Sequence, residues 1–431
     1  MKLHSDTYEH YKKSEGEWSD KVPFEWEEKR VKDLFRMVTQ TAPANNDYEL
    51  LSLYASIGVR PRKDLEARGN KASSTDGYWM VKKNDIVVNK LLAWMGSVGL
   101  SEYDGVTSPA YDVLRQVKPN IDPRYYAYLF RTETAKKIFR KNSRGIMDMR
   151  LRLYFDKLGA ITVPVPNYDS QRAISNYLDI KTAQIEKKIS LLANKAVTYK
   201  KLRRTLISNV VLRGLNENAP LKESDVNWIG KIPEHWEIKR IKETSQVIMG
   251  QSPSSTSYVD EGEGEPFMQG NAEFGDYSPT AKVWCNEVKK YAVDGDILLS
   301  VRAPVGAVNV ADGTFGIGRG LCAIRSKKKN QYKYYLTKCL TEYFNSIATG
   351  STYVAISVED VRNTLTPNPP ALEQQAIAEF LDARTEEIDL VIKNIEMHIT
   401  KLNELRIAMI NDAVTGKIKV INENITKEQV A

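Results

Sequence analysis

At 431 residues the chain is long enough for two or more ordinary cores, and 42% hydrophobic with 27% charged residues is the composition of a soluble globular protein. It has no run of 18 or more apolar residues and no basic-then-apolar leader, so we expect no membrane insertion or secretion and predict a cytoplasmic protein. Cys285, Cys322 and Cys339 lack paired spacing and do not cluster with histidines, which argues against disulfides and against a metal site.

Two long stretches carry the same seven-residue repeat of apolar side chains. One is predicted as a helix over 171–213, and the other, 203 residues later, as a helix over 371–417. Such heptads are typical of coiled coils, in which the apolar column forms a seam between paired helices. The predicted seam residues are Leu178, Ile185, Ile189, Leu192, Tyr199 and Leu206, then Leu381, Ile388, Ile392, Ile395, Leu402 and Met409. The first helix has ten basic and two acidic residues and the second five and nine, so their charges favour pairing with each other.

The remaining sequence repeats as well. The lead-in Trp18, Pro23 and Trp26 recurs 210 residues later as Trp228-x4-Pro-x2-Trp236, and we expect these residues to pack at the edge of a domain. Each half continues with strand-like segments between Gly, Pro and Asn turns, which predicts an α+β domain with a mostly antiparallel sheet. In each half a short helix (125–140 or 332–347), a short strand, an acidic turn (155–158 or 358–361) and a proline pair come before the long helix. The predicted order is a domain over 1–168, a helix over 169–215, a second domain over 216–370, a helix over 371–417 and a tail over 418–431.

Several segments of the second half resemble the DNA-specificity subunits of type I restriction-modification systems. They are the lead-in Trp228-Ile-Gly-Lys-Ile-Pro-Glu-His-Trp236, the strand and loop over 295–306, Gly318-Arg-Gly-Leu321, and Pro-Pro-Ala-Leu-Glu-Gln-Gln-Ala-Ile at 369–377. The first half carries weaker versions, including 89–96 and 108–111. No single motif decides the matter, but their order, repeated twice, is specific.

The resemblance implies two similar target-recognition domains separated by two antiparallel coiled-coil helices, with an internal pseudo-twofold repeat. Each domain is then expected to read one half of a bipartite target in double-stranded DNA, while the helices set the gap and dock two methyltransferase subunits. Restriction and translocase subunits are expected to join that core. S-adenosylmethionine, ATP and Mg are expected on the partner subunits, and this chain is expected to bind no cofactor itself.

The sequence contains no recognisable catalytic motif, so we predict a non-catalytic subunit. Asn368-Pro-Pro-Ala371 is similar to the loop of adenine methyltransferases, but alanine stands where an aromatic residue stacks on the flipped base. Gly318-Arg-Gly320 lacks the Lys-Ser/Thr of a P-loop. Two alternatives stay open: a DNA-modification enzyme with an unrecognised active site, and a coiled-coil adaptor without a nucleic-acid role.

Base reading requires polar side chains on protruding loops beside residues that contact phosphates. In the first domain the candidates for DNA contact are Arg60, Arg62, Lys63, Lys90, Ser143, Arg144, Arg150 and Arg152. In the second domain they are Gln251, Gln269, Asn271, Arg302, Arg319, Ser351, Thr352 and Tyr353. Trp79 and Trp94 are able to stack on bases, although their strand context favours a place in the core.

Overall fold

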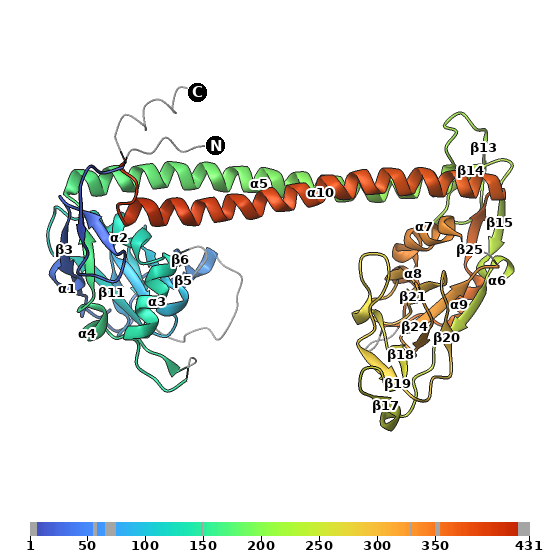
Figure 1. The fold of residues 1–431 in the computed structure, drawn as a ribbon, viewed down its shortest axis with the longest axis horizontal. Helices are drawn as coiled ribbons and strands as arrows, with labels where there is room; N and C mark the ends of the chain where they lie inside the picture. Colours follow the sequence, from blue (N-terminus) through green and yellow to red (C-terminus); the bar gives the residue numbers. More distant parts are fainter. Residues whose placement is uncertain are drawn as a thin grey trace. The chain divides into compact units, whose positions relative to one another are not determined.

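The computed structural model describes residues 7–54, 58–64, 75–147, 150–327, 330–349 and 354–420. The chain divides into two compact units, Met1–Leu192 with Met397–Ala431, and Ala193–Glu396. Each unit contains one α+β domain together with a part of each of two long helices, α5 (Tyr168–Arg213) and α10 (Ala371–Val414) (Figure 1). In the part of the chain that the structure describes, no helix is both long enough and apolar enough to cross a membrane.

The domain of the first unit is built on a four-stranded antiparallel sheet in the order β4-β11-β8-β9. Its strands are β4 (Phe35–Met37), β8 (Ile86–Asn89), β9 (Val98–Leu100) and β11 (Tyr111–Gln116). All four residues of β8 are buried, because Val87 packs into a separate cluster with Leu51 and Val59 on one face of the sheet, while Ile86 and Val88 pack against helices on the other. These helices are α1 (Val31–Leu34), α2 (Pro123–Leu129), α3 (Glu133–Asn142) and α4 (Phe155–Leu158).

The second unit repeats this sheet in the order β16-β24-β21-β22, also antiparallel. The strands are β16 (Gln246–Met249), β21 (Ile297–Ser300), β22 (Val308–Val310) and β24 (Leu321–Arg325). Its helices are α6 (Ile241–Thr244), α7 (Gln331–Cys339), α8 (Thr341–Ile347) and α9 (Val358–Asn363). The same buried ion pair crosses both sheets, Arg115 to Asp85 at 2.6 Å and Arg325 to Asp296 at 2.7 Å. The duplication and the predicted α+β class are therefore confirmed.

Outside this shared scaffold the two domains differ. The first has two small sheets, β5 (Leu51–Tyr54) with β6 (Gly58–Pro61) and β7 (Trp79–Val81) with β10 (Gly105–Thr107). The second has a five-stranded sheet in the order β17-β19-β18-β23-β20. Its strands are β17 (Tyr258–Val259), β18 (Glu265–Met268), β19 (Val283–Cys285), β20 (Tyr291–Ala292) and β23 (Phe315–Ile317). The repeat thus holds for the scaffold and not for these added sheets.

The lead-ins form short strands that pair with each other and with the proline exits. In the first unit β1 (Tyr11–Lys13) pairs with β2 (Lys21–Pro23), and β3 (Glu27–Arg30) with β12 (Thr162–Val165). In the second, β13 (Leu221–Glu223) pairs with β14 (Lys231–Pro233), and β15 (Glu237–Arg240) with β25 (Leu365–Asn368). Each sheet has only two strands, so a proline in it lies on an edge, where a missing N–H is tolerated. Trp18, Trp26 and Trp236 are buried, as expected of a structural lead-in.

Six predicted local elements are wrong in detail. The helix predicted over 125–140 is two helices, α2 and α3, because Thr132 begins a new helix by accepting a hydrogen bond from the N–H of Ala135. The helix predicted over 332–347 is likewise divided at Leu340 into α7 and α8. The two acidic turns are the helices α4 and α9, and in α9 a capping box between Ser357 and Asp360 stabilises the first turn. The short strands predicted before these turns are isolated bridges, Arg144 with Arg152 and Thr349 with Ala355.

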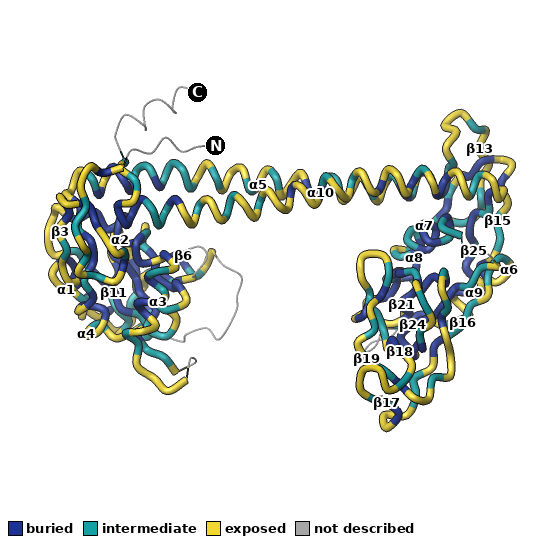
Figure 2. The backbone as a smooth tube through the Cα atoms, in the orientation of Figure 1, coloured by how far each residue is buried: buried dark blue, intermediate teal, exposed yellow. Residues whose placement is uncertain are grey.

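The heptad columns lie on the less exposed side of both long helices. All twelve predicted seam residues are buried or half-buried, and Figure 2 shows the alternation of exposed and covered positions along α5 and α10. Within the first unit, Arg406 of α10 pairs with Glu186 of α5, and within the second, Arg203 of α5 pairs with Asp389 of α10. In the second unit Lys200 also pairs with Glu396. Rising numbers in α5 meet falling numbers in α10, so the two helices are antiparallel there.

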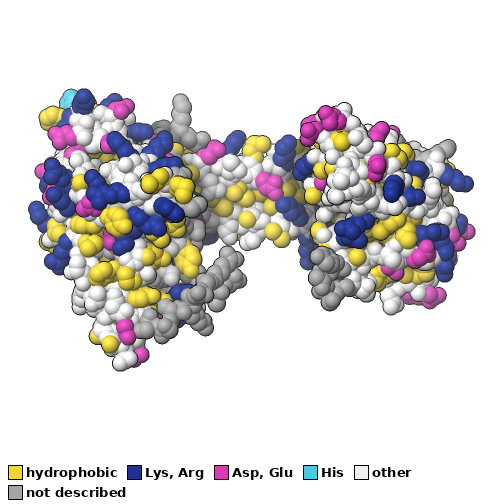
Figure 3. Space-filling model, turned by 90° about the horizontal axis from the view of Figure 1, so that it is seen from below, with side chains coloured by type: hydrophobic (Ala, Val, Ile, Leu, Met, Phe, Trp, Pro, Cys, Tyr) yellow, Lys and Arg dark blue, Asp and Glu magenta, His cyan; other side chains and the backbone are white. Residues whose placement is uncertain are grey.

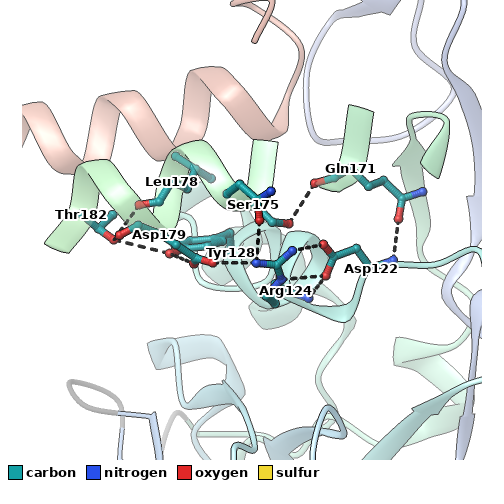
Figure 4. Close-up of polar contacts among 9 residues, drawn as sticks. Asp122, Arg124, Tyr128, Gln171, Ser175, Leu178, Asp179 and Thr182 are labelled. Atoms are coloured by element: carbon teal, nitrogen blue, oxygen red, sulfur yellow. Dashed lines mark hydrogen bonds and ion pairs between the residues drawn. The ribbon is translucent and has the colours of Figure 1, made fainter. Parts of the chain in front are cut away.

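The N-terminal part of α5 is fixed to α2 by a polar network (Figure 4). The carboxylate of Asp179 accepts hydrogen bonds from Arg124 at 2.9 Å and from the hydroxyl of Tyr128 at 2.8 Å. The side chain of Gln171 accepts from the N–H of Asp122, the residue that caps α2. The second unit has the same arrangement, in which Asp382 accepts from Gln331 and Tyr335. These bonds hold each α+β domain against a long helix in the same way.

Candidate nucleic-acid interface

Four of the predicted DNA-contact residues of the second unit line one hollow of about 600 Å³. They are Gln269, Asn271, Arg302 and Arg319. Ser252, Ser255, Tyr258, Glu273 and Ser300 also line it, and Gln251 lies beside Ser252 in the chain. These residues come from segments up to about 70 positions apart in sequence, so only the fold brings them together.

The hollow lies where two parallel strands end. Strand β18 pairs with β23 in parallel, with Met268 opposite Ile317, so the residues that follow each strand leave from the same edge of the sheet. Gln269 follows one strand, and the turn with Arg319 follows the other. A Cβ atom on Gly320 would approach the carbonyl oxygen of Gln269 to 2.5 Å, so only glycine lets the two segments lie this close. Arg319 is held in turn by a hydrogen bond from its backbone N–H to the Ser252 hydroxyl.

Three long polar side chains of this hollow are unengaged. Arg302, Arg319 and Gln269 are exposed, and none makes a side-chain hydrogen bond or ion pair with the residues that the structure describes. Exposed guanidinium and amide groups on a concave surface are suited to base edges and to phosphate oxygens. The geometry is therefore that of a recognition surface for a polyanion with hydrogen-bonding groups.

The candidates of the first unit are mostly paired with acidic side chains. Arg60 pairs with Glu102, Lys63 with Glu49 at a second hollow, and Arg144 with Asp156. These pairs are exposed, so each contributes little to stability and can open when phosphates compete for the cation. Arg62 and Arg152 also have interactions within the protein. Arg150 is exposed on the loop between the bridged residues Arg144 and Arg152, whereas the Ser143 hydroxyl donates to a helix carbonyl.

Lys90 and Arg302 both follow a strand of the shared sheet, but Lys90 occupies the position of Val301 and not that of Arg302. The backbone bonds of Lys90, to Ala110 and Leu153, match those of Val301, to Gly320 and Ile356. Its ammonium group instead lies 3.4 Å from a carboxylate oxygen of Asp112, which is almost fully buried. Burial raises the pKa of Asp112, and the nearby Lys90 ammonium opposes that rise. Lys90 therefore compensates a buried charge, which is a structural role.

The remaining candidates for DNA contact have different outcomes. Ser351, Thr352 and Tyr353 lie outside the described residues. Trp94 donates from its indole N–H to the carbonyl of Leu91 and packs under the Arg140 guanidinium, and Trp79 packs against a buried cluster, so neither is free to stack on a base. Sequence reasoning missed Glu273, which lines the hollow. The signal was present, because Glu273 closes the polar run Gln-Gly-Asn-Ala-Glu at 269–273.

A larger groove of about 1070 Å³ lies within the second unit, between the recognition domain and the long helices. Its lining includes the basic residues Lys200, Lys201, Arg203, Arg204 and Lys338, and three of them pair with the acidic Glu396, Asp389 and Glu342 in the same groove. Desolvation lowers the pKa of Lys338 from its ordinary 10.5 to about 8, and the nearby Arg203 adds to this effect. On the face shown in Figure 3, lysine and arginine side chains lie over both units, interspersed with acidic and hydrophobic groups.

A duplicated α+β scaffold with two different added sheets, joined to long paired helices, defines the architectural class of this protein. The comparisons with known proteins give the family. The model of the type I restriction modification DNA specificity domain matches residues 23–194 and again 233–401. The chain belongs to this family, and the family assigns it the role of a DNA sequence-specificity subunit.

Individual relatives agree over nearly the whole length. A protein of Methanocaldococcus jannaschii assigned as the specificity subunit of the type I restriction enzyme MjaX is 30% identical, over 96% of this chain and 97% of its own. The MjaVIII specificity subunit of the same organism is 25% identical, over 94% and 95%. Among solved structures, a chain from a study of assembly and conformational transition of the type I R-M system has a TM-score of 0.76 at 24% identity. It matches 92% of this chain and 99% of that one. The HsdS subunit of Thermoanaerobacter tengcongensis has a TM-score of 0.58 at 22% identity, over 92% and 98%. These two structures support the fold.

Proposed function

We propose that this chain is the non-catalytic, sequence-reading subunit of a DNA methylation and restriction complex, and that each recognition domain binds one half of a two-part site. The observation that carries the proposal is the hollow of the second unit, where Arg302, Arg319, Gln269 and Asn271 present unengaged donors and acceptors. Arginine pairs with guanine and amide side chains pair with adenine in the major groove. Because the added sheets differ between the domains, the two half-sites differ in sequence.

The partners in this proposal are double-stranded DNA, two methyltransferase subunits and restriction or translocase subunits. The methyltransferases dock on the long helices, whose length sets the gap between half-sites. S-adenosylmethionine, ATP and Mg are bound by these partners. Exposed leucines support docking there, since Leu202 of α5 is 51% exposed and Leu405, the matching residue of α10, is 40% exposed. Apolar side chains left open at matching positions of a repeat suit two copies of one partner.

The absence of catalysis is supported by the place of the one motif that is similar to a methyltransferase loop. Asn368 lies in strand β25 opposite Glu237, and Ala371 begins α10. The two prolines between them form the exit from the sheet into the long helix, which is a structural role. The motif therefore gives no reason to assign methyl transfer to this chain.

The test is to express the chain with its methyltransferase partner and to map methylated adenines over a whole genome. We expect a two-part motif with a fixed gap. Arg302→Ala and Arg319→Ala are expected to lose about 1–3 kcal/mol of binding at one half-site if they contact bases, with the other half-site unchanged. Arg362→Ala, an exposed arginine of α9 in the same unit, is the matched control.

Three results would contradict the proposal. Methyl transfer by the purified chain alone would favour an enzyme. No specific DNA binding even with the methyltransferase present would favour an adaptor. Unchanged competition against non-specific DNA for both arginine variants would remove these residues from the interface.

A further inference from the structure

Glu273 is placed in the hollow by a rigid segment. It ends the short 3-10 turn Asn271–Glu273, and its carbonyl oxygen accepts the N–H of Thr280 at 2.9 Å. Two residues on, the side chain of Asn309 bonds both the N–H and the carbonyl of Gly275. Asn309 is itself buried in strand β22. The backbone around Glu273 is therefore fixed before any ligand binds.

The carboxylate of Glu273 has no hydrogen-bond or ion-pair partner among the described residues. The residue is 9% exposed, and its Oε2 atom is buried without a hydrogen bond to the described residues. Glu273 also makes no ion pair or side-chain hydrogen bond with the described residues, although Arg302 and Arg319 line the same hollow. A buried carboxylate without a donor is costly, and such groups in native proteins call for an explanation at the site where they occur.

The chemistry of the hollow limits what the carboxylate can accept. A carboxylate repels phosphate, so the group that binds it must be a hydrogen-bond donor on a base. In the major groove the exocyclic amino group of cytosine is a donor that glutamate accepts, whereas adenine places an N7 acceptor beside its amino group and suits an amide. Arg302 and Arg319 can neutralise the phosphates that come with the base.

Resting on the proposed function, we propose that Glu273 specifies a cytosine in the half-site of the second domain by accepting a hydrogen bond from the cytosine 4-amino group. Glu273 is then a specificity-determining residue, and the neighbouring Gln269 and Asn271 read adjacent bases. The desolvation cost of the carboxylate is offset only when the cytosine is present. Other bases at this position leave the carboxylate unpaired, which is the source of discrimination.

The experiment first selects the half-sites from randomised DNA with the assembled wild-type complex. Each cytosine of the half-site read by the second domain is then replaced, one at a time, by 2-pyrimidinone, which lacks only the 4-amino group. Binding is measured by competition for wild type, Glu273→Met and Glu273→Ala, because neither replacement carries an oxygen that accepts from the 4-amino group. Glu263 is an exposed glutamate in the turn before β18, and Glu263→Gln, which also removes one negative charge, is the control.

We expect wild type and Glu263→Gln to lose roughly 5- to 150-fold in affinity at one substituted position. Both Glu273 variants are expected to bind cytosine and 2-pyrimidinone there within about twofold, with the half-site of the first domain unchanged. The proposal is overturned if no cytosine is required in that half-site, or if the Glu273 variants still discriminate. If Glu273→Ala fails to fold, Glu273→Met, which keeps most of the side-chain volume, separates the same two outcomes. Failure of wild type to select any two-part sequence would instead reject the proposed function.

Discussion

Two glycines that follow the long helices offer a matched test of how α5 and α10 are fixed to their domains. Gly214 follows α5 and Gly416 follows α10, with φ of 76° and 75°. A non-glycine residue at such a left-handed position costs roughly 1–2 kcal/mol. The surroundings differ, because a Cβ at 214 would lie 3.2 Å from the Trp236 ring, whereas a Cβ at 416 would lie 2.5 Å from the Pro23 ring.

The two alanine variants should therefore differ in stability. The Pro23 ring is held in the β1–β2 pair and cannot rotate away, so Gly416→Ala adds an overpacking cost of about 1–3 kcal/mol to the backbone cost. We expect a total of about 2–5 kcal/mol for Gly416→Ala and about 1–2 kcal/mol for Gly214→Ala. Unfolding of a two-unit chain is not two-state, so the assay is amide hydrogen exchange, analysed for each unit separately.

Gly416→Ala should speed exchange in the first unit, especially around Trp26, and leave the second unit as in wild type. Gly214→Ala should act on the second unit and more weakly. Equal effects of the two variants, or an effect of Gly416→Ala confined to the second unit, would refute the reasoning from the two contacts.

Two further outcomes concern the second unit and the helices. The lowered pKa of Lys338 means that folding penalises its charged form: the penalty is full below pH 8 and is relieved as pH rises toward the unfolded value of 10.5. The shift corresponds to about 3 kcal/mol, and the Tyr334 ring under the ammonium offsets about 1 kcal/mol. Lys338→Met should thus stabilise the second unit by about 2 kcal/mol at pH 7 and by less at pH 9.5. The control Lys201→Met, at an exposed lysine, should not stabilise it. A gain in stability that does not vary with pH would contradict the role assigned to Lys338. Leu202→Asp should leave folding unchanged and reduce copurification of the methyltransferase. The control Ala193→Asp lies about two and a half turns away on the opposite flank of α5 and should not reduce copurification. Equal copurification of the two variants would show that Leu202 is not part of the docking site.

The long helices and the two domains could be predicted from the sequence, because each leaves a regular pattern of residues along the chain. The heptads at Leu178 and Leu381 predicted the long helices because burial of one helix face imposes a fixed period. The paired tryptophan lead-ins and the repeated order of motifs predicted two α+β domains and the family. Helix interruptions were harder, since Thr132 looks like any other residue within an amphipathic run until its side chain caps α3.

What the sequence determined is the duplication, the class of fold and the family, since each depends on spacing that recurs along the chain. Only the tertiary structure decided which candidates act together. Lys90 and Arg302 both follow a strand, yet one is held by buried Asp112 and the other opens into the hollow. Parallel pairing of β18 and β23 brings residues that are far apart in sequence to one edge of the sheet. Only this arrangement identifies Glu273 as a candidate, because its carboxylate has no partner among the described residues there. Charge compensation and burial depend on neighbours that the fold supplies, and no local pattern in the chain encodes them.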